Sequence, residues 1–511
     1  MNWLNDAINF IDGYVWSAQL LIPLLFITGF WLTFRLHGVQ FSKLWPALKL
    51  ALFKRKDPGS EGDISHYQAL TTALAATVGV GNIVGVASAI TIGGPGALFW
   101  MWVTGVLGMA SKYSEAFLGS KYRETDAKGE VMGGPQVYLE KAIKGKGGKV
   151  LAVVFAIFGA LAAFGIGNGT QVNSVGNNLN NAFGVPHWVT AVVMFALVGL
   201  VLIGGIKVIG TVTAAFVPFM IVVYIGAGIV VLAINGSRIL PAFGLVFSNA
   251  FTVTSAGGGA IGATIALAIQ KGMARGIFSN ESGMGSAAIV AAAAKTTHPV
   301  RQGLVSMTQT FIDTIIVVTF TGLCILTTDV WKWKADDAIA AGEVTAKSDF
   351  AGEQATSYAF GETLGTSVGP KIVAICVVFF ALSTVIGWSY YGERCAVRLL
   401  GIKAQLPYRV IFTVMVLVWG LLKELTARLD TSAADATDTA IKIVWNTADI
   451  LNGLMALPNL IGLLILSGLI ARETKAYLAQ DPDLTKGGVD PEPLMSLDIS
   501  WVPAPEEVAK K

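Results

Sequence analysis

The sequence predicts an all-α polytopic membrane protein with about eleven transmembrane helices, two of which are broken within the membrane. Hydrophobic residues make up 54% of the 511-residue chain and charged residues only 14%, at a mean hydropathy of +0.63. Soluble domains contain roughly 25% charged residues. Several apolar runs are long enough to cross a bilayer. Two of these runs are interrupted by glycines and hydroxyl side chains, at 77–82 and at 255–262.

A spanning helix needs about 20 mainly apolar residues. On that basis the expected spans are 16–37, 67–92, 95–118, 150–170, 187–206, 209–234, 240–270, 303–327, 370–392, 408–425 and 440–471. Pro458 is a candidate kink in the last span. The N-terminus lacks the basic region and cleavage site of a secretory signal, so we expect the first span to be retained.

Lys and Arg are concentrated in alternate loops, and such loops are usually cytoplasmic. The segment 38–66 contains five Lys or Arg residues and 119–149 contains seven, whereas 1–15 and 171–186 contain none. The segment 271–302, with Lys271 and Arg275, is expected to be another cytoplasmic loop. With eleven spans, the N-terminus lies outside and the C-terminus inside. The polar tail beyond Arg472 is expected to be disordered or loosely bound to the surface.

Setting the first span aside leaves ten spans, which divide into two groups of five. Each group begins with a broken helix, and an odd number of spans inverts the second group, which predicts an inverted-topology repeat. The alternative is that the glycines only allow close helix packing. The expected organisation is an N-terminal segment at 1–65, repeats at 66–239 and 240–471, and a cytoplasmic tail at 472–511.

The first break has the residue types that bind a small zwitterion. Gly79 and Gly81 free backbone groups from the helix, and Thr77 and Asn82 add short polar side chains. The N–H groups that begin the outer half-helix suit a carboxylate. The carbonyl groups that end the inner half suit an amine or Na⁺.

Other functional classes find less support in the sequence. The net charge of +3 does not indicate nucleic-acid binding, and the three cysteines lie in or beside apolar segments, as packing residues do. A channel is an alternative, because glycine-exposed carbonyls can form a filter, although a filter is usually a symmetric ring of subunits. A membrane enzyme would need a clustered nucleophile and base or metal ligands, and the spans contain no such motif.

Five motifs resemble the alanine or glycine:cation symporter family, the bacterial sodium:alanine symporters. The strongest is Gly93-Gly-Pro-Gly-Ala-Leu-Phe-Trp-Met-Trp102, and the others lie at 77–85, 165–173, 275–283 and 386–393. The resemblance implies a leucine-transporter fold, coupling to Na⁺ (H⁺ in some members), and small neutral amino acids such as alanine, glycine or serine as substrates. It also implies a bacterial cytoplasmic (inner) membrane and no organic cofactor. Na⁺, the amino acid and membrane lipid are the expected partners, and the sequence does not specify an oligomeric state.

In that fold the eighth core helix supplies hydroxyl groups to a sodium site. Ser383 and Thr384 occupy this place, facing carbonyls between Thr77 and Val80. The alternative is that both hydroxyls bond back to their own helix. Trp388 is expected to close the pocket over a small side chain, and the alternative is packing against lipid.

The second break is expected to form the other wall of the site, through Gly257, Gly258 and Gly259. Phe164, Asn168 and Gln171 share one helix face at spacings of four and three. Asn and Gln are costly in lipid, so both should point into the bundle, where they either contact substrate or tie helices together.

Intramembrane charges are few, and each is a functional candidate because a charge at the bilayer centre costs about 2.5–3.5 kcal/mol on insertion scales. Asp313 would assist an ion site or carry a proton, and the alternative is a buried carboxylate bonded to neighbouring hydroxyls. Lys112 and Glu115 are expected to form an interfacial pair.

Overall fold

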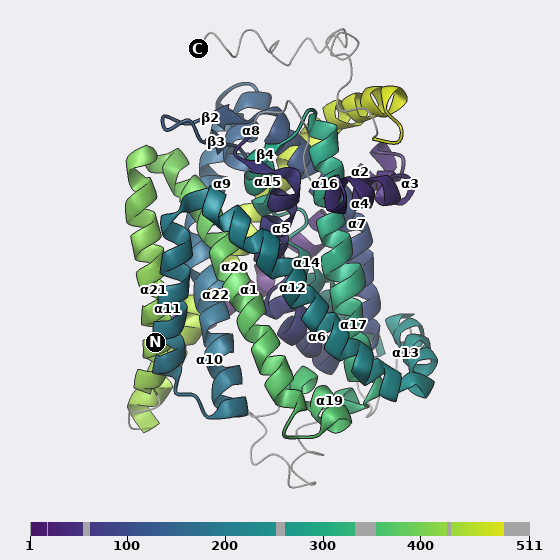
Figure 1. Cartoon of the computed structure of the whole chain (residues 1–511), viewed down its shortest axis with the longest axis vertical. Coiled ribbons are helices and arrows are strands. Elements are labelled where there is room, and N and C mark those ends of the chain that lie inside the picture. Colours follow the sequence, from purple (N-terminus) through teal and green to yellow (C-terminus); the bar gives the residue numbers. More distant parts are fainter. Residues whose placement is uncertain are drawn as a thin grey trace.

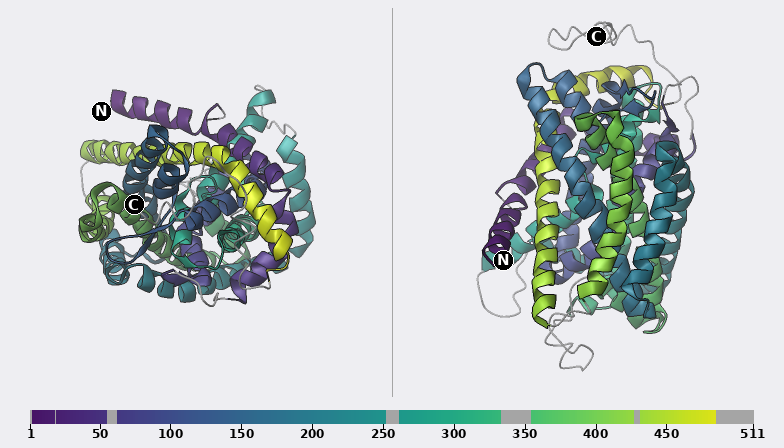
Figure 2. Two further views of the ribbon diagram at one scale, coloured as in Figure 1. Left: turned by 90° about the horizontal axis from the view of Figure 1, so that it is seen from above. Right: turned by 90° about the vertical axis from the view of Figure 1, so that its left-hand side faces the viewer.

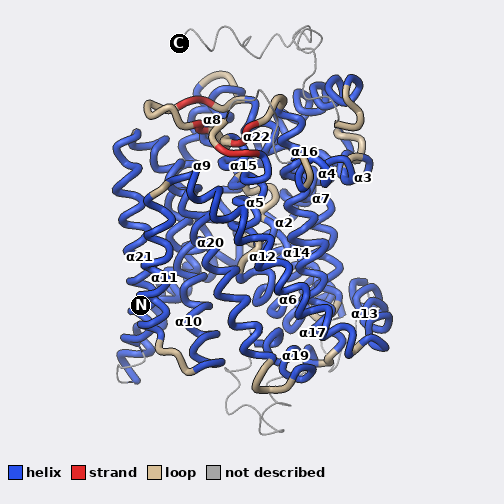
Figure 3. The backbone as a smooth tube through the Cα atoms, in the orientation of Figure 1, coloured by secondary structure: helices blue, strands red, loops and turns tan. Residues whose placement is uncertain are grey.

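The protein is a bundle of long helices in a computed structural model that describes residues 2–17, 19–54, 62–251, 261–332, 354–426 and 431–484. Within these residues, the only strands form two pairs of two residues each (Figure 3). The helices run roughly along the long axis of the molecule (Figure 1).

The first part of the chain contains the helices that precede and form the first predicted repeat. These are α1 (Asn2–Val15), α2 (Leu21–Arg35), α3 (Val39–Ser42), α4 (Leu44–Leu52), α5 (His66–Thr77), η1 (Gly81–Gly85), α6 (Val86–Gly93), α7 (Gly96–Lys121), α8 (Pro135–Ala142), α9 (Lys146–Phe164), η2 (Gly165–Gly169), α10 (Thr170–Phe183), α11 (His187–Ile203) and α12 (Gly205–Ile234).

The second part follows a short 3-10 turn, η3 (Gly236–Arg238). Its helices are α13 (Ile239–Phe251), α14 (Ile261–Asn280), α15 (Ser286–Ala292), α16 (Pro299–Thr310), η4 (Phe311–Val318), α17 (Thr319–Thr327), η5 (Val330–Lys332), α19 (Ala355–Leu364), α20 (Gly369–Leu400), η7 (Ile402–Ala404), α21 (Gln405–Thr426) and α22 (Thr431–Gln480).

The first predicted break is confirmed. Helix α5 ends at Thr77, where Val78 leaves helical geometry with φ −74° and ψ 82°. The chain resumes as the π-helical segment η1, and the two halves of the helix are bent by 53°. π-Helical segments often mark functional sites, and two more occur here, η2 and η4.

The second discontinuity that the structure describes lies at 281–285, between α14 and α15. Glu281, Gly283 and Gly285 have φ of 54°, 89° and 82°, which no helix accommodates. The break predicted at 255–262 lies outside the described residues, except for its last two, which begin α14.

The prediction that 271–302 is a cytoplasmic loop is wrong for its first part, 271–282. Lys271 and Arg275 lie on α14, and the polar run from Ser279 to Ser282 is 5% exposed or less. Hydropathy treats such a run as a loop, whereas here each of these side chains hydrogen-bonds within the protein.

The two broken helices meet at one end of the molecule. Strand β1 (Ile64–Ser65), directly before α5, pairs in parallel with β4 (Ala294–Lys295), which follows α15. The antiparallel pair β2 (Glu124–Thr125) and β3 (Val131–Met132) lies at the same end, with α8 (Figure 1). This is the end that the distribution of Lys and Arg assigns to the cytoplasm.

Long helices occur in most of the other predicted spans, with ends that differ from the predicted ones. Among the described residues, six helical stretches are long and apolar enough to cross a membrane. The bent pair His66–Thr77 and Gly81–Gly93 makes seven if it is counted as one span. The predicted count of eleven stays a prediction. The expectation of a disordered tail beyond Arg472 is wrong as far as residue 484, because α22 continues to Gln480 and Tyr477 is fully buried.

Helix α1 lies on the periphery of the bundle beside α22, as both views in Figure 2 show. The Trp16 indole N–H, just beyond α1, donates to the carbonyl of Asp449 in α22 at 3.0 Å. Segments from opposite ends of the sequence are therefore held together.

Candidate functional site

The first break is capped by side chains. The backbone N–H of Gly79 donates to Asn82 Oδ1 at 2.9 Å, and that of Val80 donates to Gln171 Oε1 at 3.4 Å. Buried N–H groups are costly when unpaired, so these two amide oxygens stabilise the break. The structure thus brings four of the predicted site residues together: Gly79, Val80, Asn82 and Gln171.

Helix α20 contacts the same break through Thr384. Its hydroxyl lies 3.1 Å from the carbonyl of Ala75 and 3.0 Å from that of Phe380. A Cβ on Gly79 would lie only 2.4 Å from Thr384 Oγ1, so a residue without a side chain is needed there. The arrangement places the Thr384 hydroxyl beside one main-chain carbonyl of α5, that of Ala75, two residues before α5 ends.

The neighbouring Ser383 has different contacts. Its hydroxyl donates to the carbonyl of Phe380 at 2.8 Å and lies 3.5 Å from Met220 Sδ in α12. Within the described residues no hydrogen bond joins Ser383 to the break. In this conformation Thr384 alone links the hydroxyl pair to α5.

Asp313, in η4, joins the first break to the end of α14. Its Oδ1 accepts from Asn82 Nδ2 at 2.8 Å, and its Oδ2 accepts from the hydroxyls of Ser279 at 3.0 Å and Thr314 at 2.8 Å. Asp313 is fully buried. The neighbouring turn adds a bond from Gln309 Nε2 to Thr77 Oγ1 at 2.9 Å.

A second buried polar cluster surrounds the break at 281–285. Trp388 Nε1 donates to Glu281 Oε1 at 2.7 Å, and Lys112 Nζ donates to the Glu281 carbonyl at 3.0 Å. Lys112 Nζ also lies 3.9 Å from Glu115 Oε2. Glu115 Oε1 accepts from the N–H of Gly285 at 3.0 Å.

This cluster corrects one expectation and excludes one alternative. Lys112 and Glu115 are not an interfacial pair, because both are fully buried and hold the second break in place. Trp388 is 2% exposed and bonded to Glu281, which contradicts packing against lipid. Sequence analysis did not single out Glu281, although it lies within the family-like motif at 275–283.

Phe164 and Asn168 have their contacts on α21, and no hydrogen bond joins either side chain to the first break among the described residues. The Phe164 ring lies 5.1 Å from that of Tyr408 and 5.6 Å from that of Phe412, and Asn168 Nδ2 donates to the Phe412 carbonyl at 2.8 Å. Both residues tie this part of the fourth span to α21. Gly257, Gly258 and Gly259 lie outside the described residues.

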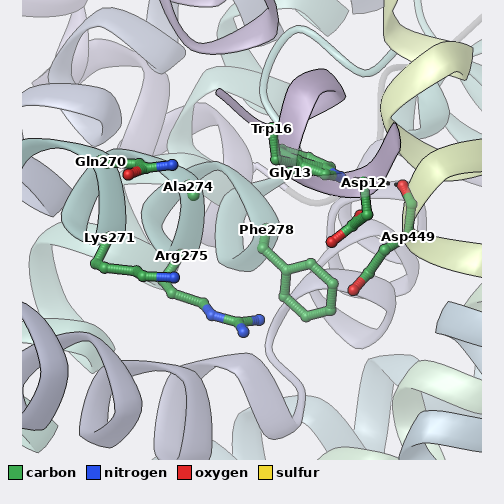
Figure 4. A pocket seen from close by; sticks show the side chains of 9 residues that line it. All are labelled: Asp12, Gly13, Trp16, Gln270, Lys271, Ala274, Arg275, Phe278 and Asp449. Carbon is green, nitrogen blue, oxygen red and sulfur yellow. Dashed lines mark hydrogen bonds between the residues drawn. The ribbon is translucent and has the colours of Figure 1, made fainter. Parts of the chain in front are cut away.

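A cavity of about 140 Å³ lies beside the first break, at Phe278. Figure 4 shows the side chains that line it. Its walls come from α1, α14 and α22 and from Trp16. Phe278 lines the cavity and also faces the break, since a Cβ on Gly81 would lie 3.4 Å from its ring. The lining residues are Asp12, Gly13, Trp16, Gln270, Lys271, Ala274, Arg275, Phe278 and Asp449.

Residues 1–490 match the sodium:alanine symporter family. The chain is 50% identical to the sodium/alanine symporter AgcS of Methanococcus maripaludis over 92% of this chain and 97% of that one. It is 46% identical to an uncharacterized transporter of Haemophilus influenzae, over 93% and 96% of the two chains. It is 33% identical to the probable sodium/glutamine symporter GlnT of Bacillus subtilis, over 96% and 93%. The crystal structure of MhsT with L-phenylalanine is similar at a TM-score of 0.49 and 14% identity, covering 82% of this chain and 99% of that one.

Proposed function

The chain belongs to the sodium:alanine symporter family, and we propose that it couples Na⁺ influx to the uptake of alanine, glycine or serine by alternating access. Sodium-coupled amino acid transport is the activity of the family, whose members are transporters and not enzymes. The observation that supports the proposal most directly is the contact of Thr384 with the end of α5 at the first break.

The cation site that we propose consists of neutral oxygens. Thr384 and Ser383 supply hydroxyls, and main-chain carbonyls around Thr77 and Val80 supply the rest. Oxygen ligands suit hard cations. Ser383 would have to change its rotamer, because its hydroxyl now bonds to Phe380 within α20.

In this proposal the substrate carboxylate accepts hydrogen bonds from the N–H groups of Gly79 and Val80. Asn82 and Gln171 occupy these donors in the present conformation, and their amide oxygens are stand-ins that a carboxylate displaces. An anion at the start of a half-helix is also favoured by the helix dipole. Gly79 and Gly81 leave room for a small ligand.

Other candidate residues complete the site. Trp388 would cover the substrate side chain, Gly257, Gly258 and Gly259 would form the facing wall, and Phe164 and Asn168 would hold the α21 side. The proposed setting is a bacterial cytoplasmic (inner) membrane with the N-terminus outside and the C-terminus inside. The basic loops and the end of α22 lie at the same end of the molecule, which supports this orientation (Figure 1).

Removing both hydroxyls tests the cation site. In reconstituted vesicles, Ser383→Ala with Thr384→Ala should raise the Na⁺ concentration for half-maximal alanine uptake about tenfold or more, because hydrogen-bonding ligands of charged groups contribute about 1.5–3 kcal/mol. Thr413→Ala, whose hydroxyl bonds back to Arg409 on α21, is the control. Unchanged Na⁺ dependence in the double variant would exclude this cation site.

Asp313 is proposed as the group that couples the ion site to the second broken helix. Asp313→Asn should lower Na⁺-driven uptake about tenfold, because an amide cannot accept from Asn82, Ser279 and Thr314 at once. Uptake driven by a proton gradient is measured in parallel. Full Na⁺-driven activity in this variant would contradict the coupling role, and selective loss of proton-driven uptake would assign the carboxylate to proton transfer.

A further inference from the structure

The cavity beside the first break has opposite charges on opposite walls. Lys271 and Arg275 extend from α14, whereas Asp12 belongs to α1 and Asp449 to α22. Figure 4 shows the two basic side chains on one side, the two carboxylates on the other, and Phe278 between them. The Arg275 guanidinium lies 5.6 Å from the centre of the Phe278 ring.

These four charged side chains do not form ion pairs with one another. Among the described residues, no ion pair within 4 Å joins Lys271 or Arg275 to Asp12 or Asp449. Asp12 Oδ1 is buried and has no hydrogen-bond partner among the residues that the structure describes. An unpaired buried carboxylate oxygen is costly, so this wall of the cavity is suited to a cationic group that comes closer to it than Lys271 and Arg275 do.

The cavity follows the outer half of the first broken helix. A Cβ on Gly93, at the far end of α6, would lie 3.3 Å from Lys271; one on Gly85 would lie 3.9 Å from Arg275; and one on Gly81 would lie 3.4 Å from Phe278. Helix α14 therefore runs antiparallel to η1 and α6, and its charged residues lie one and two turns away from the break. The α6 end is opposite the end with β2 and β3 (Figure 1), so the cavity lies in the half that the charge distribution assigns to the outside.

We propose that this cavity is a loading site for the zwitterionic amino acid, an inference that rests on the proposed function. Arg275 and Lys271 hold the α-carboxylate, Asp12 and Asp449 hold the α-ammonium, and Phe278 separates the cavity from the site at Gly79. Both substrate charges are matched without burial of a net charge. The walls are partly solvated, so the interaction is weak and concentrates substrate next to the break.

Alkylation of a cysteine at position 274 tests occupancy without relying on transport. Ala274 lines the cavity, and the native cysteines Cys324, Cys376 and Cys395 are buried. Ala274→Cys should react with an impermeant maleimide applied from outside, and alanine should slow the reaction. Propionate lacks the ammonium and alaninamide lacks the carboxylate, so neither should protect as well as alanine.

Substitutions of the charged residues, made in the Ala274→Cys protein, identify the groups that bind the amino acid. Asp12→Asn and Arg275→Gln should each raise the alanine concentration for half-protection about fivefold to tenfold. Arg275→Gln should also remove the preference for alanine over alaninamide, which a purely structural role would not do. Asp6→Asn, an exposed acid on the same α1 helix, is the matched control. Protection should persist with Gly79→Ala, which alters the central site only.

The loading site would be overturned if the alanine concentration for half-protection were the same in Ala274→Cys alone and in Ala274→Cys combined with Asp12→Asn or Arg275→Gln. Equal protection by alanine, propionate and alaninamide would do so as well. Failure of the proposed function would give a different result. Vesicles that contain the unaltered protein would then show no Na⁺-driven alanine uptake, while alanine would still protect the cysteine at position 274.

Discussion

Replacing Gly79 with alanine should reduce Na⁺-driven amino acid uptake about a hundredfold, the upper end of the cost of overpacking. The new Cβ would lie 2.4 Å from Thr384 Oγ1 and 3.4 Å from Gln171 Oε1. It would therefore push α20 away from α5 at the point where we place both the cation and the substrate carboxylate. Initial uptake rates of labelled alanine in vesicles, corrected for the amount of folded protein, measure the effect.

Two further variants show whether the loss is local. Gly226→Ala adds the same methyl group to α12, where no atom lies within 4 Å, and should transport normally. The clash in Gly79→Ala should also lower the thermal stability of the protein. Adding Thr384→Ala removes the clashing oxygen, so the thermal stability should rise again while the dependence of uptake on Na⁺ stays impaired. Normal uptake by Gly79→Ala alone would show that the contact between α5 and α20 is not needed.

Lys112→Met should lower the free energy of unfolding by about 3–5 kcal/mol, the usual cost of breaking a buried charge pair. Its ammonium group bonds to the carbonyl of Glu281 at the second break and lies 3.9 Å from the Glu115 carboxylate. Methionine would leave that carboxylate without a counter-charge, and the break would lose a donor. Thermal unfolding in detergent, followed by intrinsic fluorescence, reports the change.

A charge-balanced variant separates electrostatics from packing. Lys112→Met together with Glu115→Gln should recover part of the lost stability, because of the two buried carboxylates near Lys112 only that of Glu281 then remains charged. Lys149→Met, at an exposed position on α9, is the surface control and should have little effect. If Lys112→Met unfolds at the same temperature as the unaltered chain, the cluster does not stabilise the second break.

Local sequence determined the first broken helix, because its signal is contained within a few residues. Glycines at 79 and 81 weaken the helix within an apolar run, and Asn82 is close enough in sequence to cap the Gly79 N–H. The long apolar spans follow from hydropathy for the same reason. The family also follows from local strings, of which the one at 93–102 is the most specific.

Only the tertiary structure decided where the second break lies among the described residues and what surrounds it. The run from Ser279 to Ser282 is polar and scores as a loop, yet Asp313, Thr314, Thr310 and Trp388 supply its partners from distant helices. Helix periodicity placed Phe164, Asn168 and Gln171 on one face, but it could not show that the first two contact α21 and the third reaches the break.

The charged cavity is the clearest case of information that is absent from any local pattern. Asp12 and Asp449 come from opposite ends of the chain and line one cavity with Arg275 because α1 packs against α22 and both helices contribute to the wall opposite α14. Residue type and spacing determine which segments are helical and where one of them breaks, since these depend on neighbours along the chain. Which buried polar groups face one another depends on packing between helices, and the three-dimensional arrangement alone decides it.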